Sequence, residues 1–282
     1  MMDLFETKIL SDDDFLFFKE KIFDLSGIYL SDSKKPLIQA RLNSHLEVHK
    51  FKTFSQYRKY LQSLSIHDEE YQKFVNLLTT NKTDWFRENE HFNYLLNDFI
   101  PQWLKLGKEK LSVWSAASST GEEAYTLAMV LDKALKNTSK SFEILGSDID
   151  TNVLSKAQSG VYKKDQLENI PKEFHQHFAL GTQEIEDWMK VRKDLKKHVR
   201  FVQFNLINDD FSGFQEKFDL IFCRNVMIYF TPETIQELAE NCFSATDDQG
   251  VLIISHSESL QNVKTKWKGK KPSIYIKGKH FN

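Results

Sequence analysis

The chain has 282 residues, which is enough for one large domain or two modest ones, each with its own core. Hydrophobic residues make up 40% and charged residues 28%, the ordinary mixture of a globular protein. The formal net charge of −2 provides no bulk attraction for nucleic acid or an anionic membrane, so neither is expected as a partner. The cysteines, Cys223 and Cys242, lack metal-ligand spacing and are expected to be reduced core thiols.

The first nine residues contain two acids and no apolar stretch like that of a signal peptide. No apolar run in the sequence approaches the ~20 residues that span a bilayer as a helix. We therefore expect a cytoplasmic protein without direct membrane insertion.

The chain up to about Gly107 has helical periodicity. Three aspartates, at positions 12–14, precede apolar residues at helical spacing, among them Phe15, Phe18 and Ile22, and this pattern predicts a first helix. Further helices are predicted over residues 36–49, 53–64, 68–78 and 88–106.

After Lys110 the pattern changes to alternating strands and helices. This alternation predicts an α/β domain with a mostly parallel sheet that helices cover on both faces. The polar stretch 160–199 interrupts the alternation and is interpreted as an insertion or a small subdomain. Strands are predicted over residues 111–114, 142–146, 201–204, 218–223, 251–255 and 273–277, and helices over 122–135, 151–158 and 232–245.

The loop over residues 115–121 consists of small residues and follows the first predicted strand. Small side chains let a ligand approach the backbone at the carboxyl end of a strand, where open α/β sheets bind their ligands. The acids Glu122 and Glu123 follow directly, and they would repel a pyrophosphate but suit a ligand with a positive centre. S-adenosylmethionine fits that description, although an acid-capped helix after a tight turn explains the segment equally well.

Polar residues also follow the next predicted strands. Asp148 is positioned to accept hydrogen bonds from both ribose hydroxyls of a nucleoside, whereas Asp150 is expected to cap the next helix. Asn205 and Asn225 end the third and fourth strands, where an amide can pair with an adenine edge or with a carboxylate. A single asparagine after a strand is usually only a turn residue, but two at corresponding places favour a ligand site.

Five segments closely resemble the chemotaxis receptor methyltransferases, the CheR family. The resemblance extends over about residues 10 to 278, and the motifs occur in the order and spacing of that family. It implies an α/β fold in which an N-terminal all-helical domain (1–80), a linker and connecting helix (81–110) and a doubly wound, Rossmann-like S-adenosylmethionine-dependent methyltransferase domain (111–282) follow one another, with a small β-subdomain inserted at 160–199. The segments are Thr79–Glu88, Trp114–Glu123, Ser147–Asp150, Phe222–Phe230 and His256–Leu260.

The resemblance implies that the chain methylates glutamate side-chain carboxylates in the cytoplasmic helical region of chemotaxis receptors, for sensory adaptation. S-adenosylmethionine would be the methyl donor and S-adenosylhomocysteine the product. From the residues alone, the segment 81–83 is only a polar break between helices, so its role depends on the resemblance. By motif match the cofactor-binding residues would be Asn81, Thr83, Arg87, Glu123, Asp148, Asn205, Leu206, Asn225 and Val226.

The expected reaction needs no general base, because a glutamate with a pKa near 4.3 is already ionised at neutral pH. We expect Arg87 to orient the reacting groups and Tyr229 to line the transfer pocket, although a buried ring on a turn explains Tyr229 equally well. Substrate docking is expected at Lys34, Lys35 and Arg41. The family's basic helix is less basic here beyond Arg41, so docking by charge should be weaker.

Two other classes of function stay open, a catalytically silent receptor-docking module and a small-molecule O-methyltransferase. A nicotinamide oxidoreductase is disfavoured because the loop lacks the G-x-G-x-x-G pattern. The nine histidines show no ligand spacing, so no metal is expected. The lysine-rich segment Lys264–Lys279 is interpreted as a solvated hairpin edge rather than a site for an acidic partner.

Overall fold

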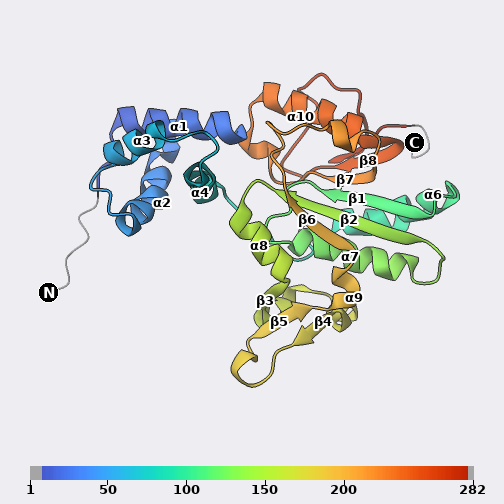
Figure 1. The fold of residues 1–282 in the computed structure, drawn as a ribbon. Coiled ribbons are helices and arrows are strands. Elements are labelled where there is room, and N and C mark those ends of the chain that lie inside the picture. Colours follow the sequence, from blue (N-terminus) through green and yellow to red (C-terminus); the bar gives the residue numbers. More distant parts are fainter. Residues whose placement is uncertain (1–7, 279–282) are drawn as a thin grey trace. The chain divides into compact units, whose positions relative to one another are not determined.

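The computed structural model describes residues 8–278, which fall into two compact units (Figure 1). The N-terminal unit ends at Thr80 and also includes the short segment Tyr229–Thr231. The second unit contains residues 81–228 and the chain from Pro232 onward, so the linker and connecting helix belong to it. No helix in the described part of the chain combines the length and the apolar character that crossing a membrane requires.

The N-terminal unit is helical, as predicted. Its core is aromatic, and Phe18, Tyr57 and Phe74 are completely buried where α1, α3 and α4 meet. Helix α1 begins where the Ser11 hydroxyl accepts a hydrogen bond from the Asp14 N–H, and it ends at Gly27, whose φ of +71° is the left-handed conformation of a helix C-cap. The helices are α1 (Asp12–Ser26), α2 (Lys35–Val48), α3 (Phe54–Ser63) and α4 (Glu69–Leu78), with a 3₁₀ turn, η1 (Asp32–Lys34), before α2.

A connecting helix opens the second unit and confirms the helix predicted over residues 88–106. It starts as α5 (Glu90–Tyr94), passes through a π-helical turn, η2 (Leu95–Phe99), and continues as α6 (Ile100–Lys105). Phe92 and Trp103 bury their rings in the main core of this unit.

The central sheet has the strand order β6-β2-β1-β7-β8-β10-β9. The first five strands in this order are parallel to one another. Strand β10 pairs antiparallel with β8, and β9 pairs antiparallel with β10, so the sheet is mostly parallel as predicted. The chain leaves β1 toward β2 and later returns to place β7 on the other side of β1, so the strand order reverses there. The strands are β1 (Lys110–Ser115), β2 (Ser141–Asp148), β6 (Val199–Gln203), β7 (Phe218–Phe222), β8 (Thr246–Ile253), β9 (Lys268–Lys271) and β10 (Ile274–Ile276).

Both faces of the sheet are covered, because successive side chains of a strand point to opposite sides. Leu111 and Val113 belong to the core cluster that contains α7 (Glu122–Leu135). The ring of Trp114 instead lies 5.2 Å from Phe218 and 5.1 Å from Phe214, in a separate aromatic group. Helices α8 (Thr151–Ser159) and α10 (Pro232–Ala245) complete the α/β domain.

The interrupted stretch forms the predicted β-subdomain, a three-stranded antiparallel sheet in the order β3-β5-β4 (Figure 1). The ring of Trp85 packs edge-on against Tyr162 of β3 and Phe178 of β4, which ties the subdomain to the linker. The elements are β3 (Val161–Lys163), η3 (Lys164–Asn169), η4 (Lys172–His177), β4 (Phe178–Leu180), η5 (Gln183–Ile185), β5 (Trp188–Val191) and α9 (Lys193–Lys196).

Candidate functional site

The small-residue loop after β1 lies against the end of β2. The Ser118 N–H donates to the Ser147 carbonyl at 2.8 Å, and the Ser119 N–H donates to Asp148 Oδ2 at 2.8 Å. The Ser118 hydroxyl is buried and lacks a hydrogen-bond partner among residues 8–278. A buried hydroxyl in this state is costly, so it marks a place where a ligand or water can bind.

Two glycines are required for this close approach. Gly121 has a φ of +95°, and a Cβ there would lie only 2.9 Å from the Ala157 Cβ. A Cβ on Gly146 would lie 2.6 Å from the ring of Phe201. Larger residues at either position would push the loop or the end of β2 out of place.

The two aspartates at the end of β2 have different roles. Asp150 Oδ1 accepts from the N–H groups of Asn152 and Val153 at 2.8 and 3.3 Å, which confirms that it caps α8. Asp148 Oδ2 accepts from the Ser119 N–H and Oδ1 accepts from the Asp150 N–H. Burial raises the pKa of Asp148 to about 6. A carboxylate can accept hydrogen bonds from donors such as ribose hydroxyls.

The linker brings Asn81 to the same edge of the sheet. Asn81 Nδ2 donates to Asp150 Oδ2 at 2.6 Å, and its carbonyl accepts from the Ser119 hydroxyl at 2.8 Å. Asn81 therefore joins the ends of β1 and β2, although it lies far from both in the sequence. Thr83, on the same linker, is half-buried.

A buried ion cluster that sequence analysis missed lies at the end of β7. The Arg224 guanidinium, only 1% exposed, lies 3.2 Å from Glu88 Oε2 and 3.0 Å from Glu123 Oε2. It also donates to the Arg87 carbonyl, and its cation lies over the rings of Phe92 and Phe222. We call Glu88, Arg224 and Glu123 the carboxylate–arginine cluster.

The two carboxylates of this cluster have different pKa shifts. Burial acts on Glu88 to raise its pKa, but hydrogen bonds from Ser255 and the charge of Arg224 outweigh it and lower the pKa to about 2. Burial raises the pKa of Glu123, and Arg224 and the Ser115 hydroxyl oppose that rise. Glu88 is therefore ionised at neutral pH, and Arg224 favours the ionised form of Glu123.

The turn after β7 is held by Glu258. Its carboxylate accepts from the N–H groups of Asn225 at 3.1 Å, Met227 at 2.8 Å and Ser255 at 2.8 Å. Asn225 has a φ of +59°, and its amide donates to the Ser255 hydroxyl at 2.7 Å. Glu258 thus fixes the backbone in which Asn225 lies, and the neighbouring Val226 is half-buried there.

The end of β6 shows the ordinary turn use of an asparagine. Asn205 Oδ1 accepts from the Ile207 and Asn208 N–H groups at 3.0 and 3.3 Å. Leu206 beside it is buried. These bonds shape the turn, and a ligand role for Asn205 and Leu206 stays a prediction.

Arg87 lies on the linker between two residues with left-handed backbone, Phe86 at φ +53° and Glu88 at φ +56°. Its guanidinium donates to the Lys82 carbonyl at 2.9 Å. Non-glycine residues adopt this conformation rarely and at a cost, which points to a fixed local structure around Arg87.

The remaining predicted residues lie in the N-terminal unit. The Tyr229 carbonyl accepts from the Tyr29 N–H at 2.8 Å, and its role in a transfer pocket stays a prediction. Lys34 is exposed, and Lys35 Nζ lies 2.6 Å from Asp12 Oδ1. The Arg41 guanidinium donates to the carbonyls of residues 78 and 79, the C-terminal end of α4, so it already has a capping role.

Three residues of the second unit place possible metal ligands close together. One donor atom each of Glu88, His91 and His256 lies within 4.8 Å of the others. Glu88 already accepts from the Ser255 hydroxyl and the His256 N–H, and the Arg224 cation lies beside it. These bonds and the positive charge oppose a metal ion, and we propose none.

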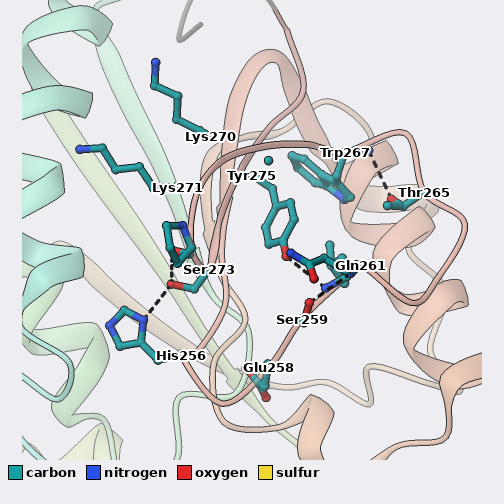
Figure 2. A pocket seen from close by; sticks show the side chains of 13 residues that line it. His256, Glu258, Ser259, Gln261, Thr265, Trp267, Lys270, Lys271, Ser273 and Tyr275 are labelled. Carbon is teal, nitrogen blue, oxygen red and sulfur yellow. Dashed lines mark hydrogen bonds between the residues drawn. The ribbon is translucent and has the colours of Figure 1, made fainter.

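A cavity of about 570 Å³ lies beside the C-terminal hairpin of β9 and β10 (Figure 2). The Tyr275 and Trp267 rings, Lys270, Lys271 and the loop from His256 line it, and the Ser273 hydroxyl lies 3.2 Å from His256 Nδ1. None of the nine predicted cofactor-binding residues is among its described lining residues. Strand β9, which was not predicted, forms the sheet edge in the lysine-rich segment, as the interpretation of a hairpin edge requires.

The geometry fits a nucleoside cofactor with charged groups at its other end. The Ser118 hydroxyl, which lacks a hydrogen-bond partner among the described residues, and the carboxyl groups of Asp148 and Glu123 all lie at the carboxyl ends of β1 and β2 or just beyond them. S-adenosylmethionine has ribose hydroxyls for Asp148 and an ammonium group for a carboxylate.

Known proteins match almost the whole chain. Residues 81–276 match the family model described as the CheR methyltransferase SAM-binding domain, and residues 13–79 match the CheR methyltransferase all-alpha domain. A chemotaxis protein methyltransferase of Escherichia coli is 35% identical, over 99% of this chain and 96% of its own. Another from Borreliella burgdorferi is 37% identical, over 86% and 87%.

A third relative, chemotaxis protein methyltransferase 2 of Pseudomonas aeruginosa, is 39% identical, over 88% of this chain and 87% of its own. Each relative is matched over most of its length, in both the helical and the sheet-containing parts. The chain therefore belongs to the CheR methyltransferase family and uses S-adenosylmethionine as its methyl donor.

Proposed function

We propose that this chain transfers methyl groups to glutamate side chains in the cytoplasmic helical region of chemotaxis receptors, and that it does so in the cytoplasm. The observation that carries the proposal is the match of both parts of the chain to relatives named chemotaxis protein methyltransferases. The all-alpha domain supports a protein acceptor, because a small-molecule acceptor does not require a separate helical unit.

S-adenosylmethionine supplies a methyl group on a sulfonium centre. In the proposed reaction a glutamate carboxylate oxygen gains the O–CH₃ bond as the S–CH₃ bond breaks, so one negative and one positive charge disappear together. The acceptor is already ionised, so the chain need not remove a proton. Its task is to hold the carboxylate in line and to exclude water.

The proposed residue roles follow from where polar groups meet. Asp148 binds the ribose hydroxyls, and Asn81 holds the adjacent loop against Asp150. Glu123 accepts a hydrogen bond from the cofactor's ammonium group. Arg87 orients the reacting groups from its constrained turn, and Tyr229 lines the transfer pocket. Thr83, Asn205, Leu206, Asn225 and Val226 complete the proposed cofactor site.

Receptor docking is proposed for the start of α2. Lys34 and Lys35 are the candidates there, since the Arg41 guanidinium already binds the end of α4. Lys34 is exposed, and Lys35 makes one ion pair with an aspartate side chain that is 94% exposed. A pair so exposed is easily exchanged for a pair with an acidic receptor helix.

The direct test is to incubate the chain with S-adenosylmethionine labelled on its methyl group and with cytoplasmic receptor fragments of the same organism. Label that alkali releases as methanol reports carboxylate esters, because N-methyl groups resist alkali. Glutamate-to-alanine changes in the receptor should abolish the label site by site. Asp148→Ala should reduce labelling at least tenfold.

Two outcomes would contradict the proposal. If S-adenosylhomocysteine binds but no receptor fragment acquires an alkali-labile methyl group, a docking module or a small-molecule O-methyltransferase becomes the better reading. If the label is stable to alkali, the acceptor is not a carboxylate.

A further inference from the structure

Arg224 connects three parts of the second unit that are far apart in the sequence. One of its nitrogens, Nη1, binds Glu123 on α7, and the other, Nη2, contacts both the Glu88 carboxylate and the Arg87 carbonyl on the linker. The guanidinium is almost completely buried. A planar, forked cation is suited to hold several acceptors in fixed directions, which a lysine ammonium cannot do.

These contacts determine where the Glu123 carboxylate lies. Ser115 donates to Oε1 at 2.7 Å, and Arg224 donates to Oε2 at 3.0 Å, so each oxygen accepts one hydrogen bond from residues 8–278. The side chain is 11% exposed. A carboxylate buried to this degree would tend to take up a proton without a cation beside it, and only the ionised form attracts an ammonium group.

The same guanidinium holds the turn that contains Arg87. Phe86 and Glu88, on either side of Arg87, both have left-handed φ values, and such backbone persists where surrounding contacts over-determine it. Here the contacts are the bond from Arg224 to the Arg87 carbonyl and the bonds from Ser255 and His256 to the Glu88 carboxylate.

We propose that Arg224 is a positioning residue that holds Glu123 for the ammonium group of the cofactor and fixes the backbone of Arg87. The inference rests on the cofactor site in the proposed function, and it divides that site in two. Arg224 and Glu123 act on the amino-acid end of the ligand, whereas Asp148 acts on the nucleoside end.

Two ligands separate these ends. S-adenosylhomocysteine has both the nucleoside and the amino-acid end, whereas 5′-methylthioadenosine keeps the nucleoside and the thioether and lacks the ammonium and carboxylate groups. Calorimetric titration of both into the full chain measures each contribution. The wild type should bind S-adenosylhomocysteine at least tenfold more tightly.

Arg224→Lys keeps the charge and loses the fork. We expect it to weaken the binding of S-adenosylhomocysteine at least tenfold and the binding of 5′-methylthioadenosine less than threefold. Asp148→Asn should weaken both ligands by similar factors. Glu88→Gln should act in the same direction as Arg224→Lys, by about threefold to tenfold. Glu90→Gln is the matched control, because Glu90 lies two residues away with a side chain that is 77% exposed, and it should change neither ligand.

The proposal is overturned if Arg224→Lys weakens both ligands equally or neither, since a general structural role would do that. If Arg224→Lys does not fold, the affinities of Glu88→Gln for the two ligands are compared instead, and an equal loss for both, or no loss, overturns the proposal. A wild type that binds both ligands equally well also overturns it.

The same measurements, together with the receptor methylation assay, distinguish failure of this inference from failure of the proposed function. A wild type that binds neither ligand removes the cofactor site and the proposed function together. Selective loss of S-adenosylhomocysteine binding in Arg224→Lys, without receptor methylation by the wild type, supports the inference and rejects the receptor as acceptor.

Discussion

Each unit of the chain holds a glutamate in a polar cluster, and the two clusters differ in charge and in the elements that they join. In the N-terminal unit Glu70 accepts from His45 Nε2 at 2.6 Å and from the Tyr57 hydroxyl at 3.1 Å, while Lys73 lies 3.5 Å away. These side chains come from α2, α3 and α4, so the cluster fastens three helices to one another.

The carboxylate–arginine cluster of the second unit is different in charge and in position. Two carboxylates surround one guanidinium, which leaves one formal negative charge, and Arg224 Nε is buried without a partner in the described residues. It lies at the end of β7, next to the carboxyl ends of the parallel strands. The cluster around Glu70 joins only helices, whereas in this one the two Glu123 oxygens accept from Ser115 and from Arg224.

The largest expected effect on stability comes from removing the cation of the carboxylate–arginine cluster. Arg224→Met would leave the Glu88 and Glu123 carboxylates, 18% and 11% exposed, without their counter-charge, and breaking a largely buried pair in this way costs about 3–5 kcal/mol. Denaturant unfolding should show this loss in the free energy of unfolding. Lys110→Met is a control, since Lys110 and its partner Glu143 are 52% and 49% exposed, and its loss should be clearly smaller.

The second prediction uses the pKa of Asp148, which burial raises to about 6. An unfolded aspartate loses its proton near pH 3.9, so between about pH 4 and 6 the folded chain binds more protons, and its stability falls as pH rises. Above pH 6 the ionised Asp148 carboxylate therefore lowers the free energy of unfolding by about 3 kcal/mol.

Asp148→Asn removes the cost of ionising this carboxyl group, and it also loses one hydrogen bond that the carboxylate accepts. We therefore expect the variant to be about 1–2 kcal/mol more stable than the wild type at pH 7 and no more stable at pH 4. Binding of S-adenosylhomocysteine should fall at least tenfold at pH 7. Melting curves and titrations at both pH values test this, and equal stability gains at pH 4 and pH 7 would contradict the assigned cause.

Much of the fold could be predicted from the sequence, because its signals are local. The periodicity of residues 122–135 and 232–245 predicted helices with those limits, and Asp150 before Thr151 and Asn152 indicated a helix cap. The sequence also predicted that the polar residues after these strands meet at one edge of the sheet, since parallel strands end on one side.

The carboxylate–arginine cluster could not be found in this way. Glu88 and Arg224 are 136 positions apart, and only the strand order brings them together. The one local signal was an arginine directly after an apolar strand, which is also typical of a surface turn. The grouping of Tyr229 with the helical unit has no local signal either, because the residue follows β7 in the sequence.

The cluster around Glu70 should affect stability without affecting ligands. Glu70→Gln keeps the acceptor oxygen for His45 and Tyr57 but turns an amide toward Lys73, so we expect a loss of about 1 kcal/mol in the free energy of unfolding. The affinity for S-adenosylhomocysteine should stay within twofold of the wild type. A tenfold loss of affinity would show that the two clusters are coupled, which the comparison denies.

The smallest stability effect is expected at the exposed end of α2, which serves as a baseline for both buried clusters. The side chains of Lys35 and Asp12 are 30% and 94% exposed, so their ion pair should contribute less than about 0.5 kcal/mol. Lys35→Ala should leave the melting temperature unchanged and raise the KM for receptor fragments a few-fold at low salt, with kcat unchanged. Asp12→Ala removes the same ion pair while keeping the lysine, so it should not raise that KM. An equal rise in both variants would mean that the pair shapes α2, and that Lys35 itself does not meet the receptor.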